Sequence, residues 1–174
     1  MKIKSLMMGA VAACAFAPAS FAERGSDGNV SIIYWQAPSI LNPYLSGGTK
    51  DIESSSLVIE PLGRFDQTGA MVAYLAEEIP TVANGGVSED LTSITWTLKS
   101  GLVWSDGSAV TAADVKFTAE YCMHPEGGCA QLAKFDGVTS VDVVDDLTVK
   151  VSFNQPKPNT YGPFVGGQTP IIQK

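Results

Sequence analysis

Several acidic side chains of the 174-residue sequence could do chemistry, so we consider them first. Glu77 and Glu78 are adjacent and face different ways on any regular helix or strand, whereas glycoside hydrolysis needs two carboxyl groups that face one cleft about 5–10 Å apart. Asp142, Asp145 and Asp146 surround an expected hairpin turn, where acidic residues favour the turn itself; calcium binding is the alternative. These patterns predict no catalytic residue.

The first 22 residues are typical of a secretory signal peptide. Lys2 and Lys4 precede an apolar run over residues 5–17, and small residues at Ser20 and Ala22 suit a cleavage site. The run is too short to span a membrane, which takes roughly 17–25 residues. We expect cleavage after Ala22 and a periplasmic protein. The alternatives are a buried N-terminal helix and a lipoprotein route, in which residues 11–14 act as a lipobox and Cys14 carries the lipid anchor.

Export would place the remaining cysteines, Cys122 and Cys129, in an oxidising compartment. An even pair in an oxidising compartment is typical of a disulfide, and the loop between them holds Pro125 and a Gly-Gly pair that favour a tight turn. The single histidine, His124, lies in the same loop, but structural zinc needs four ligands and no second cluster supplies the fourth. We expect a disulfide between Cys122 and Cys129 and no metal or cofactor. Zinc and two free thiols are the alternatives.

Composition restricts the partners. Hydrophobic residues make up 45% of the chain, as in ordinary globular domains. The 18 acidic and 11 basic residues give a net charge of −7, so a basic surface that follows phosphates is not expected and nucleic acid is not the default partner.

Hydrophobic patterning predicts a mixed α/β fold, that is, strand pairs interrupted by single helices. Ile94, Trp96 and Leu98 alternate with polar residues and indicate a half-buried strand. The expected strands are residues 30–35, 62–65, 93–99 and 102–105, with a hairpin over 138–144 and 147–153. The expected helices are residues 49–59, capped by Thr49, and one that opens with a capping box at 111–114. Residues 36–48 and the turns at 66–69 and 106–107 connect them.

The neighbouring residues indicate where each tryptophan lies. Trp96 and Trp104 lie in strand surroundings and are expected in the core. Trp35 ends the first expected strand before an irregular loop, where a position beside a ligand cleft is the alternative to the core.

Residues 95–118 resemble the signature of the family 5 extracellular solute-binding proteins. The run W-T-L-K-S-G-L-V-W-S-D-G-S-A-V-T-A-A-D-V-K-F-T, residues 96–118, shares the Asp-Gly turn and the Thr-Ala-x-Asp-Val helix start of that signature. Three departures leave these two features intact: Lys99 directly after Leu98, Trp104 in place of Phe and Ser105 in place of His. Further matches in order are the L-N-P, E-P-L and L-A-E elements at 41–43, 60–62 and 75–77, the hairpin over 141–153, and Gln155-Pro156.

The resemblance implies a type II periplasmic-binding-protein-like fold, of which this chain holds a partial first lobe with its extra subdomain. The implied organisation is a signal peptide at 1–22, the start of lobe I at 23–60, the signature-bearing subdomain at 61–160 and a truncated return segment at 161–174, with the second lobe absent. On this view the chain is an N-terminal fragment, and its apolar end, Pro170-Ile171-Ile172, is expected to lack partner strands and to favour association.

The resemblance also implies a function: the substrate-binding protein of a peptide ABC importer. Its partners would be a peptide ligand and an ABC permease complex in the inner membrane, and its ligand contacts in this half would come from Gln36, Ala37 and Pro38, whose extended backbone could pair with a peptide main chain. No catalytic residue is implied. The alternatives are a secreted hydrolase that uses Glu77 or Asp106 as its acid, and a nickel or haem receptor of the same family.

Overall fold

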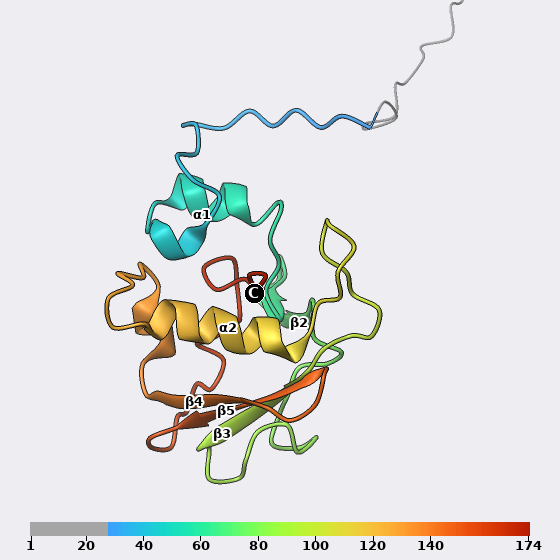
Figure 1. Ribbon diagram of the computed structural model, residues 1–174, viewed down its shortest axis with the longest axis vertical. Coiled ribbons are helices and arrows are strands. Elements are labelled where there is room, and N and C mark those ends of the chain that lie inside the picture. Colours follow the sequence, from blue (N-terminus) through green and yellow to red (C-terminus); the bar gives the residue numbers. More distant parts are fainter. Residues whose placement is uncertain (1–27) are drawn as a thin grey trace, which may run out of the picture. The chain divides into compact units, whose positions relative to one another are not determined.

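The computed structural model describes residues 28–174, so the expected signal peptide at 1–22 lies outside the described residues. These residues divide at Tyr34 into two units, and all of the regular elements belong to the second unit (Figure 1). In chain order the elements are η1 (Pro43–Leu45), α1 (Thr49–Ser55), β1 (Gly63–Phe65), β2 (Met71–Ala73), β3 (Ser93–Thr97), α2 (Ala112–Met123), η2 (Leu132–Phe135), β4 (Val138–Val143) and β5 (Thr148–Phe153). No helix among residues 28–174 is both long and apolar enough to cross a bilayer.

The core is built on an antiparallel sheet with the strand order β3-β5-β4. Ile94 and Trp96 of β3 lie opposite Val151 and Val149 of β5, and all four side chains are fully buried. The intervening side chains point to the other face, as the period of two in a strand requires. The predicted strand from residue 93 and the predicted hairpin are therefore confirmed.

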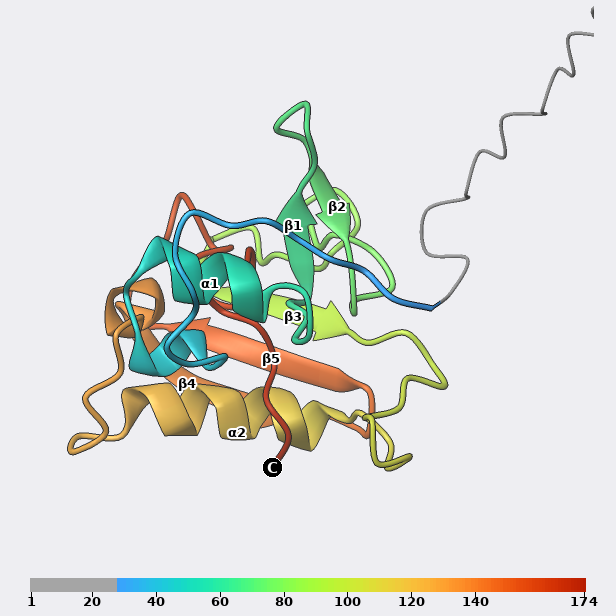
Figure 2. The ribbon, with the colours of Figure 1, turned by 90° about the horizontal axis from the view of Figure 1, so that it is seen from above.

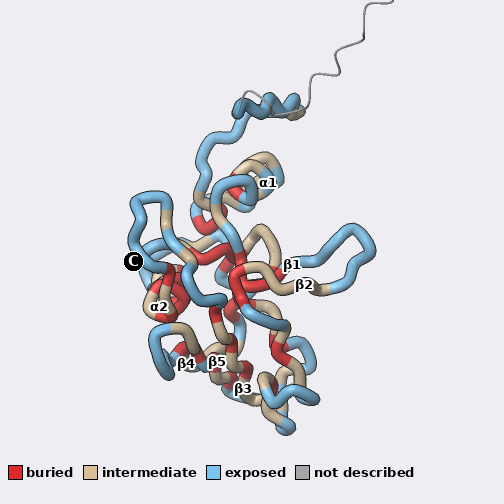
Figure 3. The backbone as a smooth tube through the Cα atoms, turned by 90° about the vertical axis from the view of Figure 1, so that its right-hand side faces the viewer, coloured by how far each residue is buried: buried red, intermediate tan, exposed pale blue. Residues whose placement is uncertain are grey.

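Helix α2 lies along this sheet (Figures 1 and 2). Its start is the predicted capping box: the Thr111 amide donates to Asp114 Oδ2 at 2.8 Å, which satisfies a donor that the first turn of a helix leaves free. The side chains of Val115 and Ala119 are fully buried, so the helix completes one face of the core. In Figure 3 the buried stretches of α2 and of the sheet lie together.

Strands β1 and β2 form a separate two-stranded hairpin. Its turn is the predicted one, in which Asp66 Oδ1 accepts hydrogen bonds from the Thr68 and Ala70 amides at 2.8 and 3.0 Å. Gly69 has a φ of +83°, a backbone conformation that favours glycine.

Three predicted elements are wrong. The predicted strand over 30–35 does not form, and residues 30–33 are exposed, Ile33 fully so, because an apolar run is buried only where other elements cover it. The first helix ends at Ser55 and its N-cap is Gly48, not Thr49; the Ser55 and Ser56 hydroxyls donate to the Ile52 carbonyl and so compete with the helical hydrogen bonds. The strand over 102–105 is reduced to one bridge, between Val103 and Ala109.

The C-terminal segment was expected to lack partner strands. Residues 170–174 form no strand, but other contacts hold them. Ile171 is fully buried and its amide donates to the Glu60 carbonyl at 2.9 Å. The next contacts are with α2: the Ile172 amide donates to Thr118 Oγ1 at 3.0 Å, and the Lys174 amide to Asp114 Oδ1 at 2.9 Å. The segment thus runs beside α2 (Figure 2), held there by side-chain acceptors.

Candidate functional site

The three residues predicted to contact a ligand, Gln36, Ala37 and Pro38, lie on the surface in a stretch without helix or strand. All three are exposed. The residues that follow are held: the Ser39 amide donates to Asp51 Oδ1 at 2.6 Å, and the Ile40 amide to the same oxygen at 3.4 Å. The backbone of this segment, called the open segment below, is therefore exposed, and its C-terminal end is held by hydrogen bonds to Asp51.

Asp51 is the residue that fixes this end. It lies in the first turn of α1 with 3% of its surface exposed. Lys50 Nζ approaches Asp51 Oδ1 at 2.9 Å, and Ser46 Oγ donates to Oδ2 at 2.7 Å. The hydrogen bond from Lys50, then those from Ser46 and from the Ser39 amide, hold the pKa of Asp51 well below its usual range.

The loop between the open segment and α1 is anchored by Tyr44. The Asn42 side chain accepts from the Tyr44 amide at 3.0 Å, which caps η1. The Tyr44 ring is fully buried, its hydroxyl donates to the Pro170 carbonyl at 2.6 Å, and burial raises the pKa of this hydroxyl. Tyr44 thus connects the loop to the C-terminal segment.

Gln131 is a polar residue that the sequence analysis missed. Its side chain, 5% exposed, donates from Nε2 to the carbonyls of Pro43 at 3.0 Å and Ser46 at 3.2 Å. The partners are 85 or more positions away in the sequence, so no local pattern reveals them. A glutamine two residues after a bridged cysteine was the only available signal.

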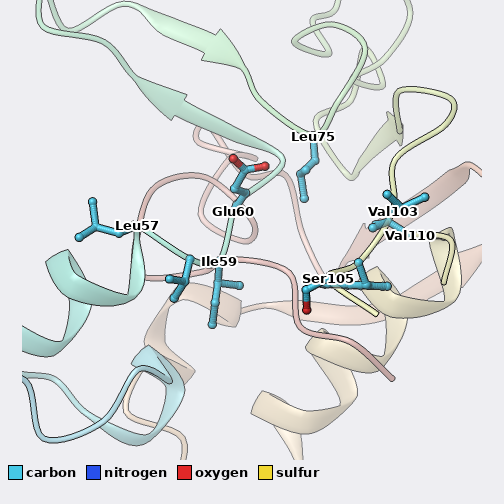
Figure 4. Close-up of a pocket in the computed structure, with 9 residues that line it drawn as sticks. Leu57, Ile59, Glu60, Leu75, Val103, Ser105 and Val110 are labelled. Carbon is cyan, nitrogen blue, oxygen red and sulfur yellow. The ribbon is translucent and has the colours of Figure 1, made fainter. Parts of the chain in front are cut away.

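A hollow of about 200 Å³ opens near the end of α1 (Figure 4). Figure 4 shows Leu57, Ile59 and Glu60 on the chain after α1, and Leu75, Val103, Ser105 and Val110 on the other side of the hollow. Leu57, Val58 and Val103 are each about two-thirds exposed, at 65%, 64% and 65%. The hollow is smaller than the roughly 300–1,000 Å³ of ordinary ligand pockets and has room for a single side chain.

The candidate catalytic acids do not converge. Glu77 and Glu78 are both exposed, and Glu78 borders a hollow beside Thr95 and Thr97. Asp106 holds its own turn by accepting from the Ser108 amide at 2.9 Å and hydroxyl at 2.7 Å. These bonds, with a further one from Gln173, lower the pKa of Asp106 to about 2, so it is a poor proton donor at neutral pH.

Cys122 and Cys129 form a disulfide in the structure, with Cα atoms 5.1 Å apart. His124 accepts a hydrogen bond from the Glu126 amide at its Nδ1, 3.2 Å away, within the same loop. Asp145 accepts from the Leu147 amide at the turn between β4 and β5. No group of three or more His, Cys, Asp or Glu side chains in residues 28–174 is arranged to hold a metal ion.

The tryptophans differ in burial. Trp96 is fully buried, as predicted. Trp104 is only half-buried, and its Nε1 donates to Asp114 Oδ2 at 3.4 Å. Trp35 is 68% exposed, close to the open segment at Gln36–Pro38.

Comparison with known families decides the class of protein. The family profile described as bacterial extracellular solute-binding proteins, family 5 Middle, matches residues 71–174, which is more than half of the chain. The chain belongs to the family 5 bacterial extracellular solute-binding proteins. This match includes the Asp106-Gly107 turn, the capping box of α2 and the β4-β5 hairpin, the same features on which the sequence resemblance was based.

Curated relatives of this family 5 chain are binding proteins of greater length. The glutathione-binding protein GsiB of Pectobacterium atrosepticum is 27% identical over 116 residues, which are 67% of this chain and 21% of the relative. The oligopeptide-binding protein OppA of Bacillus subtilis is 27% identical over 136 residues, 70% of this chain and 23% of the relative. The chain therefore spans less than a quarter of the length of these relatives.

A solved structure shows the same fold. OppA of Listeria monocytogenes bound to peptide overlays with a TM-score of 0.68 at 19% identity, over 79% of this chain and 30% of that one. The predicted fold class, a type II periplasmic-binding-protein-like α/β fold, is confirmed.

Proposed function

We propose that this chain is part of the substrate-binding protein of a peptide ABC importer, which captures peptides in the periplasm and delivers them to a permease complex in the inner membrane. The observation that carries the proposal is the open backbone segment at Gln36–Pro38, whose end is fixed by Asp51, in a chain of this family. An exposed backbone segment of this kind could pair with the main chain of a peptide. The relatives named for oligopeptide and glutathione binding support a peptide as the ligand class.

Binding without catalysis is part of the same proposal. The family is one of binding proteins, and Glu77, Glu78 and Asp106, the acids considered for a hydrolase, point to no shared cleft. Nothing in residues 28–174 favours a nickel or haem receptor over a peptide receptor.

The test is an NMR titration of the chain with millimolar tri- and tetrapeptides. Saturable shifts at the Gln36 and Ala37 amides are expected. In Ala37→Pro the backbone donor at 37 is lost while an extended conformation stays accessible, whereas Ala37→Ser keeps the donor. One lost hydrogen bond should weaken binding roughly tenfold in the proline variant and leave the serine variant unchanged. Shifts that avoid residues 36–40 contradict the proposed site.

Export and processing are separate parts of the proposal. We infer that cleavage after Ala22 produces a mature chain that begins at Glu23, and that Cys122 and Cys129 are bridged after export. Intact-mass measurement distinguishes this start from a diacylated start at Cys14, and non-reducing peptide mapping tests the bridge. The division into residues 23–60, 61–160 and 161–174 belongs to the same proposal.

A further inference from the structure

The residues that follow the disulfide-closed loop form hydrogen bonds with the loop around Tyr44, far away in the sequence. Cys122 lies in the last turn of α2, and Cys129 is tied to it across a loop in which residues 124–128 are all exposed. The next residue, Ala130, donates its amide to the Tyr44 carbonyl at 2.8 Å. Gln131 then donates to the carbonyls on both sides of Tyr44, those of Pro43 and Ser46.

From Ser46 the contacts lead to the open segment. Ser46 Oγ donates to Asp51 Oδ2 at 2.7 Å, and Asp51 Oδ1 accepts from the amides of Ser39 and Ile40. An unbroken series of hydrogen bonds therefore joins Gln131 to the residue that follows Pro38. Gln131 and Asp51 are buried and Ser46 is half-buried, so water does not readily replace a lost partner at these three residues.

The disulfide ties the start of this series of hydrogen bonds, at Gln131, to helix α2. Without it, the exposed loop would connect α2 to Gln131 only through Pro125 and two adjacent glycines, one of which, Gly128, has a φ of +60°. A covalent bond to the last turn of a twelve-residue helix removes most of that freedom. Gln131 is then held at a fixed distance from the helix.

We propose that Gln131 is a positioning residue for the ligand-binding segment, and that the Cys122–Cys129 disulfide sets the place of Gln131. The importance of this for binding rests on the proposed function, because Gln36–Pro38 is the proposed ligand edge. The coupling between Gln131 and Ser39 does not rest on it.

Amide hydrogen exchange of the full chain without ligand, followed by NMR, tests the coupling. Gln131→Met keeps the size of the side chain and removes its donor. We expect the Ser39 and Ile40 amides to exchange at least tenfold faster in this variant, while the Ala119 amide in the middle of α2 keeps its rate. The matched control is Gln67→Met in the exposed β1-β2 turn, which should change neither. Rates at Ser39 and Ile40 within twofold of wild type in Gln131→Met would overturn the proposal.

A second variant tests the route and guards against general unfolding. Ser46→Ala removes the hydroxyl between Gln131 and Asp51, and we expect it to speed Ser39 and Ile40 exchange by a similar factor. If Gln131 acts through Ser46, the double variant exchanges no faster than Ser46→Ala alone. If the two increases in the exchange rates of Ser39 and Ile40 multiply in the double variant, Gln131 and Ser46 act independently, which would contradict the proposed series.

The disulfide is tested by replacing both cysteines with alanine. The same two amides should exchange faster, and Ala130 with them. Unchanged exchange rates at Ser39 and Ile40 would contradict the claim that the disulfide sets the position of Gln131. Because these measurements contain no peptide, their failure is distinct from a failure of the peptide titration.

Discussion

At the indole of Trp96 the sheet buries an N–H group for which residues 28–174 supply no acceptor. The ring itself is well packed, with an edge-to-face contact to Tyr161 at a centroid distance of 6.3 Å. Its burial followed from the alternation of Ile94, Trp96 and Leu98, a local pattern. The burial of Asp51 did not, because its partners at Ser39 and Ser46 come from a loop whose path the sequence does not specify.

Two substitutions separate packing from hydrogen bonding at Trp96. Trp96→Ala should lower the free energy of unfolding by roughly 3–5 kcal/mol, since it empties a large aromatic site in the core. Trp96→Phe keeps most of the apolar volume and removes an N–H that has no partner, so its loss should be clearly smaller. Urea denaturation midpoints measure both. Equal losses in the two variants would show that the indole nitrogen has an acceptor after all.

Asp106 predicts an acid-dependent loss of stability. Its pKa is lowered from 3.8 to about 2 by the Ser108 hydroxyl, the Ser108 amide and Gln173. Since the folded pKa lies below the unfolded one, its contribution is fully present above about pH 4 and is lost as the pH falls toward 2. Asp51, with its pKa lowered mainly by Lys50, acts in the same direction. Denaturation midpoints between pH 6 and 2 should therefore fall less steeply in Asp106→Asn than in wild type, and equal slopes would contradict this.

Among the elements, those with a strict local pattern were predictable. The capping box of α2, the alternation of β3 and the Asp145-Asp146 turn of the β4-β5 hairpin each lie within a few residues. The predicted elements were wrong where contacts between residues far apart in the sequence determine the structure. Residues 30–33 carry strand-like side chains but form no strand, and the end of α1 depends on two serine hydroxyls. Of the candidate site, the open segment was predicted, whereas its supports Asp51 and Gln131 were not.

Helix α2 supports the C-terminal segment through Thr118. This side chain is fully buried, donates to the Asp114 carbonyl at 2.7 Å and accepts from the Ile172 amide. Thr118→Val keeps the shape but leaves the Ile172 amide without its acceptor, so a loss of roughly 1–3 kcal/mol is expected. Limited proteolysis should also cut residues 170–174 sooner. Thr118→Ser, which retains the hydroxyl, should resist cleavage like wild type; equal cleavage of the two variants would mean that this hydroxyl does not hold the segment.

For the whole molecule, we expect weak peptide binding by this chain alone. The proposed edge at Gln36–Pro38 offers a few hydrogen bonds, each worth about 1 kcal/mol net, whereas micromolar affinity takes roughly 8 kcal/mol. The hollow beside Leu57 and Leu75 can add one side chain at most. Titration calorimetry against a di- to pentapeptide pool should show no saturation at micromolar concentrations. Micromolar binding would show that the described residues hold a complete site.

The C-terminal segment has a consequence for which substitutions the protein tolerates. Thr118 and Asp114 contact the backbone amides of Ile172 and Lys174, and a backbone amide is the same whatever side chain it carries. The exposed position 174 can therefore exchange residues freely, proline excepted, whereas Ile172 is partly buried against the core. Positions 114 and 118 cannot exchange freely, and Asp114 also begins α2. Among homologues, sequence variation should accordingly be greater at position 174 than at positions 114 and 118.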